Sequence, residues 1–251
     1  MKSLIAVIKR ELLLYFSSYF TPMFVAIYVT LQTVVFAYVL TDFVKPEFLG
    51  NLTYLQFYAL GSPTIALSTT SYAIGRDIFR DKESGFSKYL SSLPLDRKVI
   101  VIGRGLSGAI RSTILILPLY LLAAVLLQSP LLSLLLGGFL LFILGMGLSG
   151  LGMAYVSLFN RENNWSTLVT ILDVALVRSS SAMYPIVAMP GWLQLVSRLN
   201  PLSYGADSVR SIVSGSSAGY PLGIIIVIAF SLFALTVGAT LHLRRFSRRA
   251  I

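Results

Sequence analysis

The 251-residue sequence contains no cysteine and only one histidine, His242. The absence of cysteine excludes disulfides, thiolate metal ligands and cysteine nucleophiles. His242 has no carboxylate or second histidine near it in the sequence, so we interpret it as an ordinary residue near a helix end rather than a metal ligand.

Charged residues are also scarce. They make up 12% of the sequence, against 56% hydrophobic residues, whereas a soluble domain carries roughly 25% charged residues. Too few polar side chains remain to cover a water-soluble globule. The net charge of +10 does not indicate nucleic-acid binding, because the basic residues cluster between apolar segments rather than along one face.

Two motifs of energy-using or hydrolytic proteins are missing. No G-x-x-x-x-G-K-[ST] sequence occurs, so there is no P-loop to hold ATP phosphates, and no H-E-x-x-H occurs. We therefore expect no enzyme active site and no bound cofactor in this chain. The energy for any active process has to come from a partner or from an ion gradient.

Long apolar runs are what the sequence does contain. A helix needs about 20 residues to cross the ~30 Å hydrocarbon core of a bilayer, and six segments meet or approach this length. They are Pro22–Thr41, Leu52–Gly75, Leu106–Gln128, Leu131–Phe159, Asn163–Met183 and Ala218–Leu241. The fifth is the weakest, because it contains Asp173 and Arg178. The sequence predicts an all-α, multi-pass membrane protein with six transmembrane helices in one domain, 1–251.

The distribution of lysine and arginine predicts the orientation. With six spans, 15 of the 20 basic residues fall on the side that holds both termini, and three (Lys45, Arg198 and Arg210) fall on the other. Cytoplasmic loops carry an excess of lysine and arginine. Both termini are therefore predicted to be cytoplasmic, with the protein in the cell membrane.

Three segments are predicted to lie outside the spans. Residues 1–19 form an interfacial helix on the cytoplasmic leaflet, with apolar Ile5, Ile8, Leu12 and Phe16. Residues 76–104 form a cytoplasmic loop with seven basic and four acidic residues, a mixture that favours docking to another protein, and 82–92 could form a short helix. Residues 184–217 form two short extracellular amphipathic helices.

Two ordered sets of local patterns carry a family resemblance. The cytoplasmic loop reads RDKESGFSKYLSSLPLDR from Arg80 to Arg97, and the C-terminal third contains Tyr184-Pro185, a Met-Pro-Gly-Trp run ending at Trp192, an Asn-Pro-Leu-Ser-Tyr run from Asn200, and Arg210. Together they resemble the ABC-2 family of membrane-spanning (permease) subunits of ABC transporters, and within it the drug-exporter branch.

The resemblance implies partners and a direction of transport. The chain is expected to pair with a second copy or a paralogue of itself and with a separate P-loop ATPase subunit, which would bind ATP and Mg. It is expected to move an amphiphilic, lipid-like or drug-like substrate outward.

The resemblance, together with the residue patterns, assigns three groups of candidate functional residues. Those for ATPase coupling are Arg80, Asp81, Glu83, Gly85, Pro94 and Arg97. Those for the substrate pathway are Phe57, Tyr58, Tyr72, Ser166, Thr170 and Asp173. Those for an extracellular gate are Tyr184, Pro185, Trp192, Asn200, Pro201, Tyr204 and Arg210.

The pathway group also has an independent basis. Ser166, Thr170 and Asp173 fall on one helical face, and a polar stripe inside a span normally faces protein or water. Hydrogen bonding between helices would explain the stripe equally well. Two other functions stay open: an ion-coupled secondary transporter that uses Asp173, and a membrane scaffold that transports nothing.

The predicted topology can be tested directly, because the chain has no cysteine. Single cysteines at Ser17, Ser84 and Ser247 should resist an impermeant thiol reagent in intact cells, whereas cysteines at Asn51 and Ser216 should react. Labelling of the Ser84 variant from outside would contradict the six-span arrangement.

Overall fold

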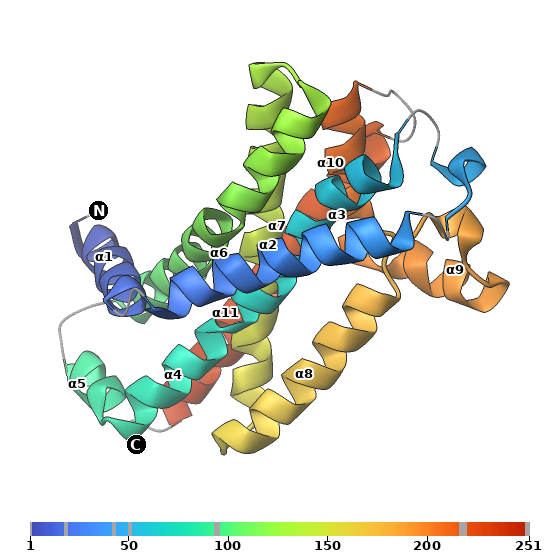
Figure 1. Cartoon of the computed structure of the whole chain (residues 1–251). Coiled ribbons are helices and arrows are strands. Elements are labelled where there is room, and N and C mark those ends of the chain that lie inside the picture. Colours follow the sequence, from blue (N-terminus) through green and yellow to red (C-terminus); the bar gives the residue numbers. More distant parts are fainter. Residues whose placement is uncertain are drawn as a thin grey trace.

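The computed structural model describes residues 2–17, 20–41, 44–49, 52–92, 96–215 and 220–248. Within these ranges the chain is helical and contains no strands, which confirms the all-α class (Figure 1). The helices are α1 Lys2–Phe16, α2 Phe20–Leu40, α3 Tyr54–Tyr72, α4 Ile74–Glu83, α5 Phe86–Ser92, α6 Arg97–Leu127, α7 Leu131–Leu158, α8 Glu162–Arg178, α9 Gly191–Leu199, α10 Pro201–Ser214 and α11 Tyr220–Arg248, with two 3-10 turns, η1 Pro46–Phe48 and η2 Ile186–Ala188.

Four of the predicted spans coincide with helices that are long and apolar enough to cross a membrane. These segments are Pro22–Leu40 in α2, Arg97–Leu127, Leu131–Leu158 and Pro221–Arg244 in α11. The described part of the sixth predicted span begins at Tyr220, and the third span begins earlier than expected, at Arg97 after the charged loop.

The other two predicted spans correspond to α3 and α8, which do not reach this apolar standard within the described residues. Nearly all of α3 is buried, including Ser62, Thr64, Ser68, Thr70 and Ser71. A helix that is surrounded by other helices does not face lipid, so its side chains need not be apolar. The 17 residues of α8 extend about 26 Å at 1.5 Å per residue. The six-span count therefore stays a prediction.

The core forms around α3, which packs against α2, α6, α7 and α10. Leu60 and Leu67 of α3 are fully buried, as are Leu144 and Leu148 of α7. A close backbone approach joins α7 to α11: a Cβ at Gly238 would lie 2.0 Å from the carbonyl oxygen of Gly150. Glycine at these positions lets these two long apolar helices touch along their backbones.

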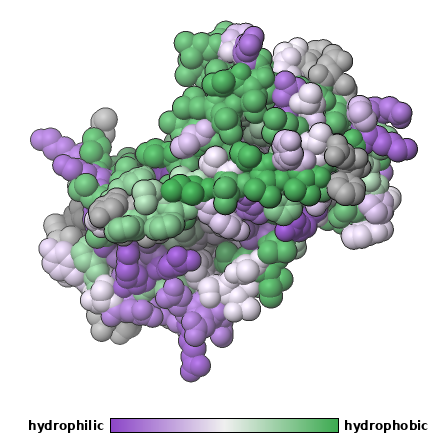
Figure 2. Space-filling model, in the orientation of Figure 1, coloured by the Kyte–Doolittle hydropathy of each residue, from purple (hydrophilic) through white to green (hydrophobic). Residues whose placement is uncertain are grey.

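Apolar side chains also cover much of the outer surface (Figure 2). The exposed large residues of α2 include Phe24, Tyr28, Leu31 and Tyr38, and polar atoms gather instead at the lower end of the view, where α4, α5 and the start of α8 lie. The end of α11 lies at this same end, whereas the start of α1 lies higher, at the left of the view (Figure 1). Arg76, Arg80 and Lys82 of α4 are among the basic residues of the lower end.

The segment after α8 differs from the prediction of two interfacial helices. In α9, Trp192, Leu195 and Leu199 are exposed along one side, and the interfacial position of this helix stays a prediction. Helix α10 does not lie on a surface: most of its residues are buried, and it packs against α3, α7 and α11. Its small residues Gly205 and Ala206 allow the helix to enter the bundle.

Candidate functional site

The charged loop folds into a helical hairpin of α4 and α5. The short helix predicted for 82–92 is in fact broken, because α4 ends at Glu83 and α5 begins at Phe86. Gly85 makes the turn with φ 75°, a left-handed conformation that glycine adopts without the steric penalty of other residues. Glu83 and Tyr89 are exposed on the hairpin, Tyr89 by 58%.

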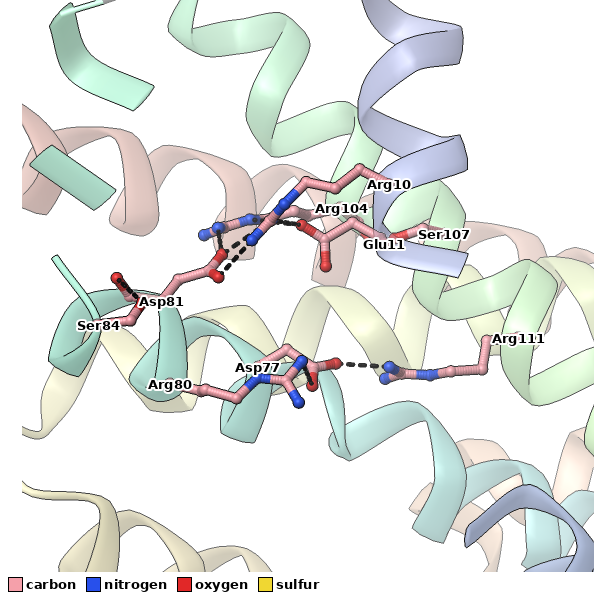
Figure 3. Close-up of polar contacts among 9 residues, drawn as sticks. All are labelled: Arg10, Glu11, Asp77, Arg80, Asp81, Ser84, Arg104, Ser107 and Arg111. Atoms are coloured by element: carbon pink, nitrogen blue, oxygen red, sulfur yellow. Dashed lines mark hydrogen bonds and ion pairs between the residues drawn. The ribbon is translucent and has the colours of Figure 1, made fainter. Parts of the chain in front are cut away.

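A buried cluster of ion pairs joins this hairpin to α1 and α6 (Figure 3). Asp81 of α4 accepts hydrogen bonds from Arg10 of α1, at 2.7 Å from Nη2 to Oδ1, and from Nη2 of Arg104 in α6. Glu11 of α1 pairs with Arg10 at 2.8 Å and lies 3.5 Å from Nε of Arg104. The side chain of Arg104 is only 2% exposed.

A second set of contacts extends the cluster along α6. Arg111 of α6 donates to Oδ2 of Asp77 in α4, and its guanidinium lies 4.4 Å from the centre of the Tyr15 ring in α1. Arg10 stacks on Phe86 of α5 at 3.7 Å. The same three helices, and α5 with them, are thus joined at several points.

The electrostatics of the cluster follow from its burial. Removing a charge from water is costly, so buried ions persist only when they are paired and hydrogen-bonded. Burial raises the pKa of Glu11, while the nearby Arg104 and Arg10 act in the opposite direction. The alternating arginines and carboxylates join α1, α4 and α6 to one another.

The structure separates the predicted coupling residues into two groups. Arg80 and Glu83 are exposed, and Arg80 pairs with Asp77 at 3.2 Å. Asp81 is buried and faces the cluster, so its carboxylate holds the hairpin rather than facing a partner. Arg97 begins α6, and Pro94 lies outside the described residues.

The predicted pathway residues meet between α3 and α8. Asp173 of α8 accepts a hydrogen bond from Ser68 and another, at 2.9 Å, from Thr69, both of α3. Ser166 and Thr170 donate to carbonyl groups of their own helix. The polar stripe of α8 therefore makes a hydrogen-bonded contact to α3 and also keeps an exposed side at Thr170.

The three aromatic residues of the pathway group are buried in this conformation. Phe57, Tyr58 and Tyr72 all lie in the core of the single chain, and Tyr72 packs on Tyr155 of α7. They would reach a substrate only if α3 and its neighbours moved apart.

The predicted gate residues occupy different environments. Trp192 is 69% exposed on α9, and Tyr184 is half-buried between the helices. Asn200 caps α10 by accepting from the Leu202 amide, and its side-chain amide donates to the Leu176 carbonyl at 2.6 Å. This cap, at the Asn200-Pro201 step, ties the start of α10 to the end of α8.

Arg210 joins α3, α10 and the segment after α8 at this end of the bundle. Its guanidinium donates to the carbonyl oxygens of Phe57, Ser181 and Ala182 and to the carboxylate of Asp207, at 2.8 to 3.0 Å. It also lies 3.5 Å from the centre of the Phe57 ring. Of the other gate residues, Tyr204 lies on α10 with Arg210, and Pro185 lies directly before η2.

Sequence reasoning missed the partners within the ion-pair cluster: Arg10, Glu11, Arg104 and Arg111. The predicted loop includes Arg104, yet this residue is buried in α6. One signal was visible. Arg10 and Glu11 interrupt an otherwise apolar stretch, and Arg111 is a lone charge near the start of a span. A charge in such a place needs a partner.

Comparisons with known proteins agree with these features. A family model for the ABC-2 type transporter matches residues 2–214. The putative transport permease ycf38 of Cyanophora paradoxa is 28% identical over 201 residues, 78% of this chain and 68% of that protein. The daunorubicin resistance ABC transporter permease protein DrrB1 of Streptomyces coeruleorubidus is 26% identical over 206 residues, 76% of this chain and 69% of that protein. The probable doxorubicin resistance ABC transporter permease protein DrrC of Mycobacterium tuberculosis is 26% identical over 184 residues, 69% of this chain and 66% of that protein.

The cluster predicts a large difference between two charge-removing substitutions. Asp81→Asn leaves Arg104 buried without its carboxylate, and we expect it to lower the free energy of unfolding by about 3 kcal/mol or more. Arg80→Ala removes an exposed pair and should cost about 1 kcal/mol or less. Denaturation of the purified protein in detergent measures both. Equal losses for the two variants would contradict the buried role of Asp81.

Proposed function

Because this chain belongs to the ABC-2 type transporter family, we propose that it is the membrane-spanning subunit of an ABC exporter. A separate P-loop subunit binds ATP and Mg and hydrolyses the ATP. Two membrane subunits, identical or paralogous, form the transporter. The substrate moves outward and is an amphiphile, lipid-like or drug-like, as the names of the two drug-resistance relatives suggest.

The observation that supports this proposal most is the α4–α5 hairpin, together with the ion pairs that join it to α1 and α6. A docking element has to project side chains toward a partner while its base transmits force to the membrane helices. Glu83 and Tyr89 project, and Asp81 fixes the base to Arg10 of α1 and Arg104 of α6. Movement of the hairpin would therefore be passed directly to α6, which runs the length of the bundle.

The route for the substrate is proposed along the exposed side of α8 and the neighbouring part of α3. Thr170 is exposed there and Asp173 is only half-buried. A polar face of this kind is costly against lipid, so a second subunit or a water-filled path would have to cover it. The contact of Asp173 with Ser68 and Thr69 would close the route in this conformation.

The docking role of the hairpin is tested by reversing one charge. Glu83→Arg should reduce copurification of the ATPase subunit, or uncouple ATP hydrolysis from transport, because it places a positive charge where a complementary surface expects a negative one. Glu47→Arg is the matched control, since Glu47 is also exposed but lies on η1, between α2 and α3. Unchanged association and unchanged coupled ATP turnover in Glu83→Arg would contradict this role.

The route is tested at Asp173. Asp173→Asn keeps the side-chain shape but removes the charge. Hydrogen bonds to charged groups contribute about 1.5–3 kcal/mol, so the contact with Ser68 and Thr69 that closes the route should weaken. We expect ATP-driven transport in proteoliposomes to fall about tenfold or more. Glu162→Gln, which removes a charge at the start of the same helix, serves as the control. Full transport by Asp173→Asn would exclude a role in the route, and transport driven by an ion gradient without ATP would favour a secondary transporter.

A further inference from the structure

A cleft of about 1240 Å³ opens at the end of the bundle opposite to the α4–α5 hairpin. It lies among the start of α3, the turn between α6 and α7, helix α10 and the start of α11. No residue of α8 lines it, so it is separate from the route proposed above. Its lining combines hydroxyl and amide groups with leucine side chains.

The charged group in the cleft that faces solvent is Asp207, whose side chain is 46% exposed. Its Oδ1 atom accepts hydrogen bonds from Ser181 Oγ at 2.9 Å and from Arg210 Nη1 at 2.8 Å. Within the described residues, the Oδ2 atom accepts no hydrogen bond. The carboxylate thus has one oxygen committed to the protein and one available to a ligand.

Arg210 is the cationic residue among those that line the cleft, but it cannot serve an anion. Its three nitrogen atoms donate to protein acceptors on α3, on α10 and on the segment after α8, and its face covers the Phe57 ring. An anionic ligand would be repelled by the Asp207 carboxylate and would find no available cationic group among the lining residues. The cleft therefore disfavours anions.

A strong cation preference is also disfavoured. The positive charge of Arg210 is 2.8 Å from the Asp207 oxygen that it binds, so the pair is close to neutral as a unit. A ligand ammonium group would gain from Asp207 and lose from the adjacent guanidinium. The local charge balance favours an uncharged ligand that can donate hydrogen bonds.

The remaining polar groups suit such a ligand. Gln128 in the α6–α7 turn and Ser133, Ser208 and Ser214 supply an amide and hydroxyl groups along the lining. Hydroxyl groups both donate and accept, so they complement a ligand that carries several hydroxyl groups of its own. Leu127 and Leu222 form apolar lining beside them, which would suit a hydrocarbon chain.

We propose that this cleft binds an uncharged amphiphile with a polyhydroxylated head group, such as a sugar-headed lipid. One head-group hydroxyl donates to Asp207 Oδ2, other hydroxyls bond with Gln128 and the serines, and the tail lies along Leu127 and Leu222. The proposal does not rest on the ATPase-driven function, because the cleft lies within one chain and needs neither ATP nor a second subunit.

Three probes with the same octyl chain test the proposal: octyl glucoside, octyltrimethylammonium and octyl sulfate. Each is titrated below its micelle-forming concentration, by equilibrium dialysis, against the protein in phosphatidylcholine nanodiscs, with empty nanodiscs subtracted. We expect saturable binding of one octyl glucoside per chain, at least tenfold tighter than either charged probe. Equal binding of the three probes, tighter binding of a charged probe, or no saturable component would overturn the proposal.

Substitutions locate the binding. Ser133→Trp fills the cleft from α7 and should abolish saturable octyl glucoside binding, whereas Ser157→Trp, at the other end of the same helix, should leave it unchanged. If Ser133→Trp does not fold, Gln128→Trp fills the cleft from the turn. Asp207→Asn should weaken octyl glucoside binding only a few fold and reduce the discrimination against octyl sulfate. Binding that persists in the filled variants would overturn the assignment.

Discussion

The bridge that Asp81 makes between Arg10 and Arg104 is the interaction on which the α4–α5 end of this protein depends. One carboxylate joins three helices that are far apart in sequence. Because Asp81 and Arg104 are buried, either charge left without its partner would be strongly unfavourable, and the partly exposed Arg10 joins α1 to the same carboxylate. This gives a physical reason for a transporter subunit to keep charged groups in its interior. They attach the α4–α5 hairpin to α6, a helix of 31 residues.

In the middle of the bundle, too, polar side chains are paired with other groups of the protein. Helix α3 carries serine and threonine residues that lipid would not favour, and the structure surrounds it with α2, α6, α7 and α10. Asp173 reaches it from α8 through Ser68 and Thr69. These hydroxyl-to-carboxylate contacts are weaker ties than the ion pairs around Asp81. The α3–α8 contact is accordingly the seam at which the bundle could open most easily.

The opposite end is held by backbone carbonyl groups rather than by ion pairs alone. Arg210 gathers carbonyl oxygens from α3 and from the segment after α8, and Asn200 joins α10 to the last turn of α8. Helix α10 is thereby fixed inside the bundle, while α9 presents its apolar side outward. A gate at this end would involve α9 more readily than α10, because α10 cannot move without breaking several buried hydrogen bonds.

The sequence by itself determined the protein class, the all-α composition and the family, since apolar length, charge distribution and local patterns are properties of segments. It also predicted four spans that the structure confirms as apolar helices of sufficient length. It could not show that Asp81 faces inward, that Gly85 breaks the helix of the charged loop, or that α10 is buried. Nor did it reveal Arg10 and Arg104 as partners of one carboxylate. Those facts depend on which helices become neighbours, and a single charge in a sequence indicates only that a partner is needed, whereas the tertiary structure decides which residue the partner is.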